Sequence, residues 1–337
     1  MKAIRLHAAR DLRVHDEPIP QPKPGEVLIN VKAIGVCGSD LHWYCEAGIG
    51  DSTLHHPLVL GHEFAGVIAS GPRTGERVAV DPALPCGQCE WCLTGHPNLC
   101  PNTRFSGHGK EDGALREYMV WPEQALYTLP DSISDEDGAM LEPLGVAIHA
   151  VDLGKLTSGA HIGIFGCGPI GLLTLEMARV MGATRIVATD RLQHRLDLAT
   201  ELGATETFQA TDLDHEDSQA ILASTHQRGL DVVFECAGDQ HAVDAAFDAV
   251  RIGGTVILCG IPSDDHTSFV ASVARRKGLT IKMVRRMKHV YPRAIELVVR
   301  GRVDVRALVS HHLPLADSAN AFRIADTRQG VKVMIDV

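Results

Sequence analysis

The chain has 337 residues, 45% of them apolar and 22% charged, and its formal net charge is −10 at pH 7. This length suggests two domains, and the negative charge argues against nucleic acid or an anionic membrane as a partner. No signal peptide is expected, because residues 1–16 carry charges throughout and lack an apolar segment. The longest uncharged apolar-rich stretch, 162–175, is interrupted by glycines and a proline and is too short to span a bilayer, so we expect a cytoplasmic protein.

The first 145 residues predict an irregular β-rich unit. Short apolar runs are separated there by turn-forming segments at 18–26, 70–76 and 84–89. From about residue 155 the pattern changes, with predicted strands at 161–166, 185–190, 231–238 and 255–262 and predicted helices at 169–181, 191–204 and 241–250. This alternation predicts a doubly wound parallel sheet. The tail after residue 288 predicts one helix, 291–300, and then short strands, and the acidic stretch 212–217 predicts a solvated loop or a helix start.

Gly166, Gly168 and Gly171 form the pattern G-x-G-x-x-G between a predicted strand and a predicted helix. In that context the pattern predicts a dinucleotide site, because the glycines permit a tight turn, close approach of the pyrophosphate and packing of the helix on the strand. Asp190 ends the next strand, and its carboxylate can accept the ribose hydroxyls of NAD while repelling the additional phosphate of NADP. Arg191 follows directly and leaves NADP open. The alternative is a glycine-rich turn without a ligand.

A cluster of four cysteines has the spacing C-x2-C-x2-C-x7-C and consists of Cys86, Cys89, Cys92 and Cys100. In a reducing compartment such a cluster indicates metal ligands rather than disulfides. Four thiolates complete a tetrahedral zinc shell and leave no open position, so the predicted site is structural. Four unrelated thiols, or a redox role for the CxxC pairs, are the weaker alternatives.

A second candidate metal site combines Cys37 with His62 and a glutamate, either Glu63 or Glu142. Hydride removal from an alcohol requires loss of the hydroxyl proton, and a zinc ion with an open position lowers the pKa of that hydroxyl. Mixed sulfur, nitrogen and oxygen ligands suit such a catalytic zinc. The sequence leaves open which glutamate binds the metal directly and which holds a metal-bound water.

Ser39 and His42 follow Cys37 closely and are candidates for carrying the alcohol proton to solvent. For His42 the alternative is an ordinary surface or core histidine, because its spacing alone is not diagnostic.

These motifs occur in an order that resembles the medium-chain zinc alcohol dehydrogenases, and among them the sorbitol (polyol) dehydrogenase branch. The resemblance covers nearly the whole chain and is carried by residues 37–44, 56–66, 78–100, 112–119, 142–150, 166–171 with Asp190, and 285–292. Ser39, and the pair Glu142-Pro143 where other branches often place a cysteine ligand, support the polyol branch.

The resemblance implies an α/β fold with a GroES-like β-rich catalytic domain at 1–150, which includes a structural zinc lobe at about 84–101. A Rossmann domain would cover 151–287, residues 288–337 would return to the catalytic domain, and the active site would lie in the interdomain cleft. Cys37, His62, Glu63 and Glu142 would surround the catalytic zinc. The NAD site would be lined by Gly166, Gly168, Pro169, Ile170, Gly171, Asp190, Arg195, Cys259, Gly260, Ile261, Val284, Arg285 and Arg286. Members of the family usually form homodimers or homotetramers.

Three departures from the polyol branch concern the substrate. The pair Trp43-Tyr44 is reversed, Arg285-Arg286 stands where the branch has Arg-Tyr, and residues 106–111 replace an apolar stretch. With Glu142, the residues Trp43, Tyr44, His108, Lys110, Arg285 and Arg286 are the candidate substrate contacts, and their basic members favour a polyol, sugar derivative or sugar acid. The alternatives are an L-threonine, butanediol or L-idonate dehydrogenase and, in another class, a non-catalytic NAD-binding zinc protein.

Overall fold

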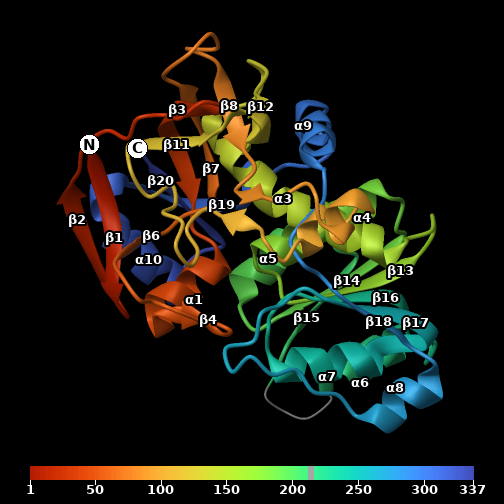
Figure 1. Cartoon of the computed structure of the whole chain (residues 1–337). Coiled ribbons are helices and arrows are strands. Elements are labelled where there is room, and N and C mark those ends of the chain that lie inside the picture. Colours follow the sequence, from red (N-terminus) through yellow and green to blue (C-terminus); the bar gives the residue numbers. More distant parts are fainter. Residues whose placement is uncertain (212–215) are drawn as a thin grey trace. The chain divides into compact units, whose positions relative to one another are not determined.

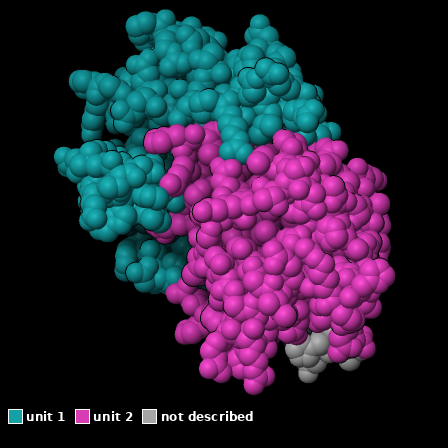
Figure 2. Space-filling model, turned by 90° about the vertical axis from the view of Figure 1, so that its right-hand side faces the viewer, with its two compact units in different colours: residues 1–142, 291–337 teal, residues 143–290 magenta. Residues whose placement is uncertain are grey.

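The computed structural model describes residues 1–211 and 216–337. The chain forms two compact units, one made of residues 1–142 and 291–337 and the other of residues 143–290 (Figure 2). Helix α3 (Asp135–Gly154) continues through the first of these limits. The domain limits expected from the sequence, 150/151 and 287/288, remain a prediction.

A seven-stranded sheet forms the centre of the first unit, in the order β12-β8-β7-β3-β20-β19 with β11 paired to β3 (Figure 1). The C-terminal strand β20 pairs antiparallel with β3, so the end of the chain completes the N-terminal unit. The strands are β3 (Glu26–Gly35), β7 (Glu63–Ile68), β8 (Arg77–Val80), β11 (Tyr118–Pro122), β12 (Leu126–Thr128), β19 (Val309–Pro314) and β20 (Lys332–Asp336).

Smaller elements surround this sheet. A three-stranded sheet contains β1 (Lys2–Ala8), β2 (Asp11–Asp16) and β6 (Leu58–Val59), and two-stranded pairs are formed by β4 (Gly48–Ile49) with β5 (Ser52–Thr53) and by β9 (Ala83–Leu84) with β10 (Arg104–Phe105). The helices are α1 (Gly38–Glu46), α2 (Glu90–Leu93), α9 (Tyr291–Val299) and α10 (Ser318–Asp326), with 3-10 turns at Pro97–Leu99, Glu123–Ala125, Arg306–Leu308 and Leu315–Asp317.

The helices α1, α3 and α10 correct the sequence analysis. Helix α1 and the first turns of α3 lie in the region expected to be β-rich, and α10 lies in the tail expected to hold only strands after one helix. Both α1 and α10 have nine residues, so each offers too few apolar repeats for a clear helical period. In α10 the buried side chains Ala321, Phe322 and Ile324 still mark one helical face.

The second unit contains a six-stranded sheet in the order β15-β14-β13-β16-β17-β18, in which every neighbouring pair is parallel. This confirms the expected doubly wound class. Helices α6 and α7 lie on one face and α4 on the other (Figure 1). The strands are β13 (His161–Phe165), β14 (Arg185–Asp190), β15 (Glu206–Gln209), β16 (Leu230–Glu235), β17 (Val250–Leu258) and β18 (Thr280–Met283), and the helices are α4 (Pro169–Val180), α5 (Gln193–Glu201), α6 (Glu216–Ser224), α7 (Gln240–Ala249) and α8 (Ala271–Lys277).

Each unit has an apolar core of its own. Ile29, Ile34 and Phe64 are fully buried in the first, and Phe165, Val233 and Val256 are fully buried in the second. Within the described residues, every helix is too short or too polar to cross a bilayer. Of the acidic stretch at 212–217, residues 212–215 lie outside the described residues, and Glu216 begins α6.

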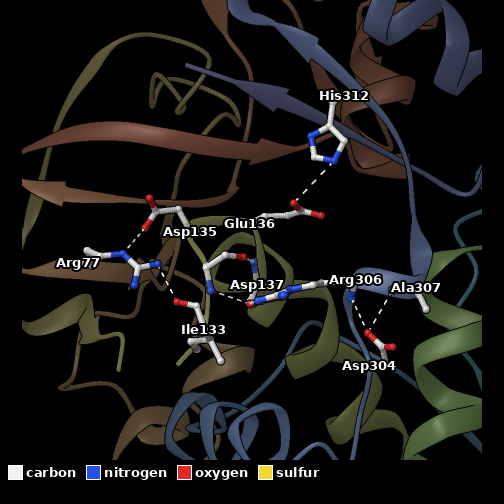
Figure 3. Close-up of polar contacts among 10 residues, drawn as sticks. Arg77, Ile133, Asp135, Glu136, Asp137, Asp304, Arg306, Ala307 and His312 are labelled. Carbon is white, nitrogen blue, oxygen red and sulfur yellow. Dashed lines mark hydrogen bonds and ion pairs between the residues drawn. The ribbon is translucent and has the colours of Figure 1, made fainter. Parts of the chain in front are cut away.

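The start of α3 is fixed by its acidic first turn, which carries Asp135, Glu136 and Asp137 (Figure 3). Each of the three carboxylates lies against a basic side chain from another element: Asp135 against Arg77, Glu136 against His312 and Asp137 against Arg306. Ser134 and Asp137 exchange side-chain and backbone hydrogen bonds, which is a capping box. Negative charge at a helix N-terminus is stabilising, so this turn anchors the helix that carries Glu142.

Candidate functional site

Three of the expected metal ligands meet where β3 ends and β7 begins. β3 and β7 are antiparallel with Gly35 opposite Glu63, so the chain just beyond β3 lies beside the start of β7. Candidate ligand atoms of Cys37, His62 and Glu63 all lie within 4.8 Å of one another. His62 and Glu63 are buried and Cys37 is half-buried. Cys37 is also the N-cap of α1.

Asp40 holds two of these ligands, and the sequence analysis missed it. One carboxylate oxygen lies 3.2 Å from His62 Nδ1, and the other accepts the backbone N–H of Cys37 at 3.1 Å. Burial acts to raise the pKa of Asp40, but His62 and the backbone N–H groups of Cys37 and Gly61 outweigh it and lower that pKa. A carboxylate bound to one ring nitrogen orients a histidine for metal binding through the other nitrogen.

Lys332 is the second residue that the sequence analysis missed. Its ammonium group forms an ion pair with Glu63 and donates to the Val36 carbonyl at 3.0 Å, and both charged side chains are 1% exposed. Burial acts to lower the pKa of Lys332, and the negative charges of Glu63 and Cys37 outweigh it and raise that pKa.

The charges of this cluster fit a divalent cation. With Cys37 as a thiolate and His62 as the neutral imidazole that a metal requires, Cys37, Asp40 and Glu63 are negative and Lys332 is positive, which leaves two negative charges in a largely buried site. An uncompensated buried charge is costly, and a zinc ion would neutralise the excess. Thiolate, imidazole and carboxylate are ligands that zinc accepts, and three protein ligands leave a fourth position open.

Ser39 lies beside two of the ligands. Its hydroxyl donates to Cys37 Sγ at 3.4 Å and lies 3.4 Å from His62 Nε2. His42, one turn further along α1, instead pairs with Glu46 at 3.4 Å. Glu142 is buried in α3, and the ligand group found among the described residues contains Glu63 rather than Glu142.

An aromatic group extends from the cluster. Phe105, which the sequence analysis also missed, packs against His62 with ring centroids 5.2 Å apart and against His108 at 6.2 Å. Trp43 donates to His108 through Nε1 at 3.3 Å. Tyr44 instead packs against Phe322, with Arg10 over its ring. Of these candidate substrate residues, Trp43 and His108 therefore lie on the side of His62, whereas Tyr44 packs elsewhere.

The four-cysteine cluster also assembles. Ligand sulfurs of Cys86, Cys89, Cys92 and Cys100 lie within 4.8 Å of one another. Helix α2 and the turn at Pro97–Leu99, which lie between these cysteines, contain no buried residue. Burial raises the pKa of the Cys100 thiol, but backbone N–H groups of Cys86 and Asn102 outweigh it and bring that pKa to about 6. Helix α2 and this turn therefore lack a core of their own, and the four sulfurs converge instead.

The glycine pattern occupies the turn between β13 and α4 and continues through Pro169 and Ile170, the first residues of the helix. Any larger residue at position 171 would place its Cβ 1.9 Å from the Gly166 carbonyl oxygen, which is too close. The glycine therefore permits the close approach of helix and strand that the fingerprint requires. Asp190 ends β14, and its carboxylate accepts the backbone N–H of Cys167 at 2.7 Å and of Leu192 at 2.9 Å. Arg195 lies 3.9 Å from Asp190, and Arg191 points its charge to Asp239 at 3.7 Å.

The remaining candidate cofactor residues lie at the same edge of this sheet. Cys259, Gly260 and Ile261 follow β17, and Val284 continues the pairing beyond β18 by donating to the Leu258 carbonyl. Arg285 is exposed, and Arg286 has a left-handed backbone with φ of 52°. The candidate substrate residue Lys110, which belongs to the first unit, is also exposed. Ligands of doubly wound sheets bind beyond the carboxyl ends of the strands, so β13, β14, β16 and β17 carry the candidate dinucleotide site.

Comparison with known proteins shows which families and relatives the chain is similar to. Residues 23–131 match the family of alcohol dehydrogenase GroES-like domains, and residues 169–300 match the zinc-binding dehydrogenases. The chain is 37% identical to the sorbitol dehydrogenase of Gallus gallus over 99% of its own length and 95% of that protein, and 36% identical to the sorbitol dehydrogenase of Bacillus subtilis (strain 168) over 96% and 93%.

A solved structure extends the likeness to the fold. The crystal structure of a zinc-binding dehydrogenase from Sinorhizobium meliloti 1021, bound to NADP, matches with a TM-score of 0.90 and 30% identity, covering 100% of this chain and 99% of that one.

Proposed function

This chain belongs to the zinc-binding dehydrogenases with an alcohol dehydrogenase GroES-like domain, and we propose that it oxidises a secondary alcohol of a polyol or related sugar derivative to the ketone with NAD. The observation that carries the proposal is the mixed cluster of Cys37, His62 and Glu63, which offers three zinc ligands and an open position. The presence of a dinucleotide fingerprint in the same chain adds the hydride acceptor.

We assign roles to the side chains from their contacts. Zinc, when bound, acts as a Lewis acid that lowers the pKa of the substrate hydroxyl. Cys37 and His62 would hold the ion, and Asp40 fixes the orientation of the His62 ring. Lys332 holds Glu63 in place and keeps one of its oxygens occupied. The hydroxyl of Ser39 lies 3.4 Å from two ligand atoms, and we assign it the role of a relay that accepts the substrate proton while releasing its own toward solvent.

The polyol substrate rests on the relatives, which include sorbitol dehydrogenases and a protein named D-xylulose reductase, and on the polar aromatic group of Trp43 and His108. A ring edge and an imidazole beside the metal ligands offer both apolar contact and hydrogen bonding, which a polyhydroxylated chain requires. We infer a preference for NAD over NADP from Asp190, because a carboxylate at the end of β14 repels the additional phosphate of NADP.

Some residue roles, the domain limits, the oligomeric state and the cellular location are also part of the proposal. The roles of Glu142, His42, Arg285 and Arg286 remain predictions from the resemblance, as do the domain limits and a homodimer or homotetramer. A cytoplasmic location is supported by the nine cysteines, all of which are free.

The test is a steady-state screen of xylitol, sorbitol, galactitol, L-idonate and L-threonine, each with NAD and with NADP. We expect turnover with at least one polyol and a preference for NAD. Turnover of simple hydrophobic alcohols alone would refute the polyol assignment, and turnover of L-threonine alone would move the chain to the amino-acid-oxidising enzymes of this fold. Preferential oxidation of L-idonate would favour a sugar acid as the natural substrate.

A further inference from the structure

The buried carboxylate of Glu235 ends β16 and is not among the candidate site residues named so far. It is 2% exposed, and within the described residues no cationic side chain pairs with it. Its Oε1 instead accepts two backbone N–H groups, those of Ala237 and Gly238, each at 2.7 Å. A buried carboxylate without a cation is costly unless it is fully hydrogen-bonded, so this arrangement requires an explanation.

The second carboxylate oxygen faces the neighbouring loop. A Cβ on Gly260 would lie 2.6 Å from Glu235 Oε2 and 2.1 Å from the backbone nitrogen of Gly238. Burial, the larger effect, raises the pKa of Glu235, while the backbone N–H groups of Gly238, Ala237, Gly260 and Asp239 lower it in part. One carboxylate therefore lies between the loop that follows β16 and the loop that follows β17.

These two loops lie at the point of the sheet where ligands bind. The strand order places β16 beside β13, and the chain reverses its direction across the sheet between these two strands (Figure 1). The dinucleotide crosses a doubly wound sheet at this switch point, beyond the carboxyl ends. A Cβ on Gly166 of the fingerprint would lie 2.7 Å from the backbone nitrogen of Ala237, so the glycine turn contacts the loop that Glu235 holds.

We propose that Glu235 is a positioning residue for the dinucleotide cofactor, whose side-chain carboxyl group links the loop 236–239 to the loop 259–261 and so sets the width of the cofactor crevice. The inference rests on the proposed NAD-dependent function. The carboxylate of Glu235 accepts the backbone N–H groups of Ala237 and Gly238, and so holds the loop that carries them. It acts through the loops rather than by touching the cofactor.

The substitution Glu235→Gln tests this role, because an amide retains the shape but offers only one acceptor oxygen. In one orientation of the amide, its NH2 group faces the two N–H groups after β16, and in the other it faces the loop after β17. Either orientation weakens the connection between the two loops. We expect the Kd for NADH, measured by fluorescence titration of the holoenzyme, to rise about tenfold. The KM for NAD should rise with it, while kcat at saturating NAD stays within about threefold of the wild type.

The matched control is Glu206→Gln, which removes the charge of a carboxylate in the same sheet at the start of the edge strand β15, where Glu206 pairs with Arg185 at 2.5 Å. It should leave the Kd for NADH unchanged. A lower melting temperature in Glu235→Gln with a Kd for NADH within twofold of the wild type would assign Glu235 a purely structural role and overturn the inference.

Hydrogen exchange in the wild type provides a test that needs no variant. The amides of Ala237 and Gly238 should exchange slowly before any cofactor is added, because Glu235 already binds them. Fast exchange there would overturn the inference. Wild-type enzyme that binds NADH but oxidises no polyol would refute the proposed substrate and would leave the role of Glu235 standing.

Discussion

The two cysteine-containing clusters of this chain assemble in opposite ways. The four-cysteine cluster lies in a segment whose short helix α2 has no buried residue and whose Trp91 and Leu93 side chains are exposed. The cluster of Cys37, His62 and Glu63 lies between strands of the seven-stranded sheet, where Asp40 and Lys332 hold its members. The first cluster provides the structure of its segment, and the second receives its structure from the sheet.

The difference shows what a metal site needs when one coordination position must stay free for substrate. Four thiolates saturate a metal, so their segment needs no other support. An incomplete shell needs neighbours that keep its ligands in place when substrate exchanges at the open position. The predictions below test this contrast, in order of decreasing expected effect.

The largest effect is expected from His62→Ala, which removes a ligand of the incomplete shell. Because a Lewis-acid zinc contributes several kcal/mol to catalysis, kcat should fall about 10³-fold or more. The Kd for NADH should change little. Steady-state kinetics and NADH titration check both, and unchanged turnover would remove the catalytic zinc from the account.

Lys332→Met breaks the buried pair with Glu63. Loss of one partner of a buried ion pair costs about 3–5 kcal/mol, so the free energy of unfolding should fall by that order. The loss should be larger in zinc-free than in zinc-loaded enzyme, since the metal also compensates the Glu63 charge. Lys2→Met, which breaks the exposed pair with Asp16, is the control and should cost less than about 1 kcal/mol. Equal losses in the two variants would show that Lys332 does not support Glu63.

Asp40→Asn replaces the carboxylate that orients His62. Loss of such a partner weakens metal affinity about 10- to 100-fold, and competition with a chelator measures the change. Glu46→Gln on the same helix, which removes the exposed partner of His42, should leave zinc affinity unchanged. Wild-type affinity in Asp40→Asn would contradict the supporting role.

The smallest effect on chemistry is expected from Cys100→Ser in the saturated cluster. The segment 86–100 should lose its zinc and become sensitive to proteolysis, because the metal substitutes for a core. Turnover per remaining zinc should stay within about threefold. A loss of turnover as large as that of His62→Ala would abolish the distinction between the two clusters.

The clusters also differ in how far the sequence predicted them. Spacing alone identified Cys86, Cys89, Cys92 and Cys100, because all four ligands lie within one short segment. Lys332 was missed, because it reaches Glu63 only after β20 pairs with β3, across 269 positions of sequence. For Asp40 a signal was present, since it stands three residues after Cys37 in the position of a helix-capping acid.

The same reasoning explains the second unit. The fingerprint glycines and Asp190 are local patterns, so the parallel sheet and its cofactor edge followed from them and from the alternation of strands and helices. Glu235 was missed, because a glutamate at a strand end carries no signal until the loops of β16 and β17 are placed together. Phe105 was missed for a similar reason, since its contact with His62 depends on the pairing of β9 with β10.

Diffraction data collected on both sides of the zinc absorption edge would probe the incomplete shell most directly. The account predicts two anomalous peaks per chain, one among the four cysteine sulfurs and one bounded by the side chains of Cys37, His62 and Glu63. A single peak, confined to the four-cysteine segment in crystals grown with excess zinc, would contradict it.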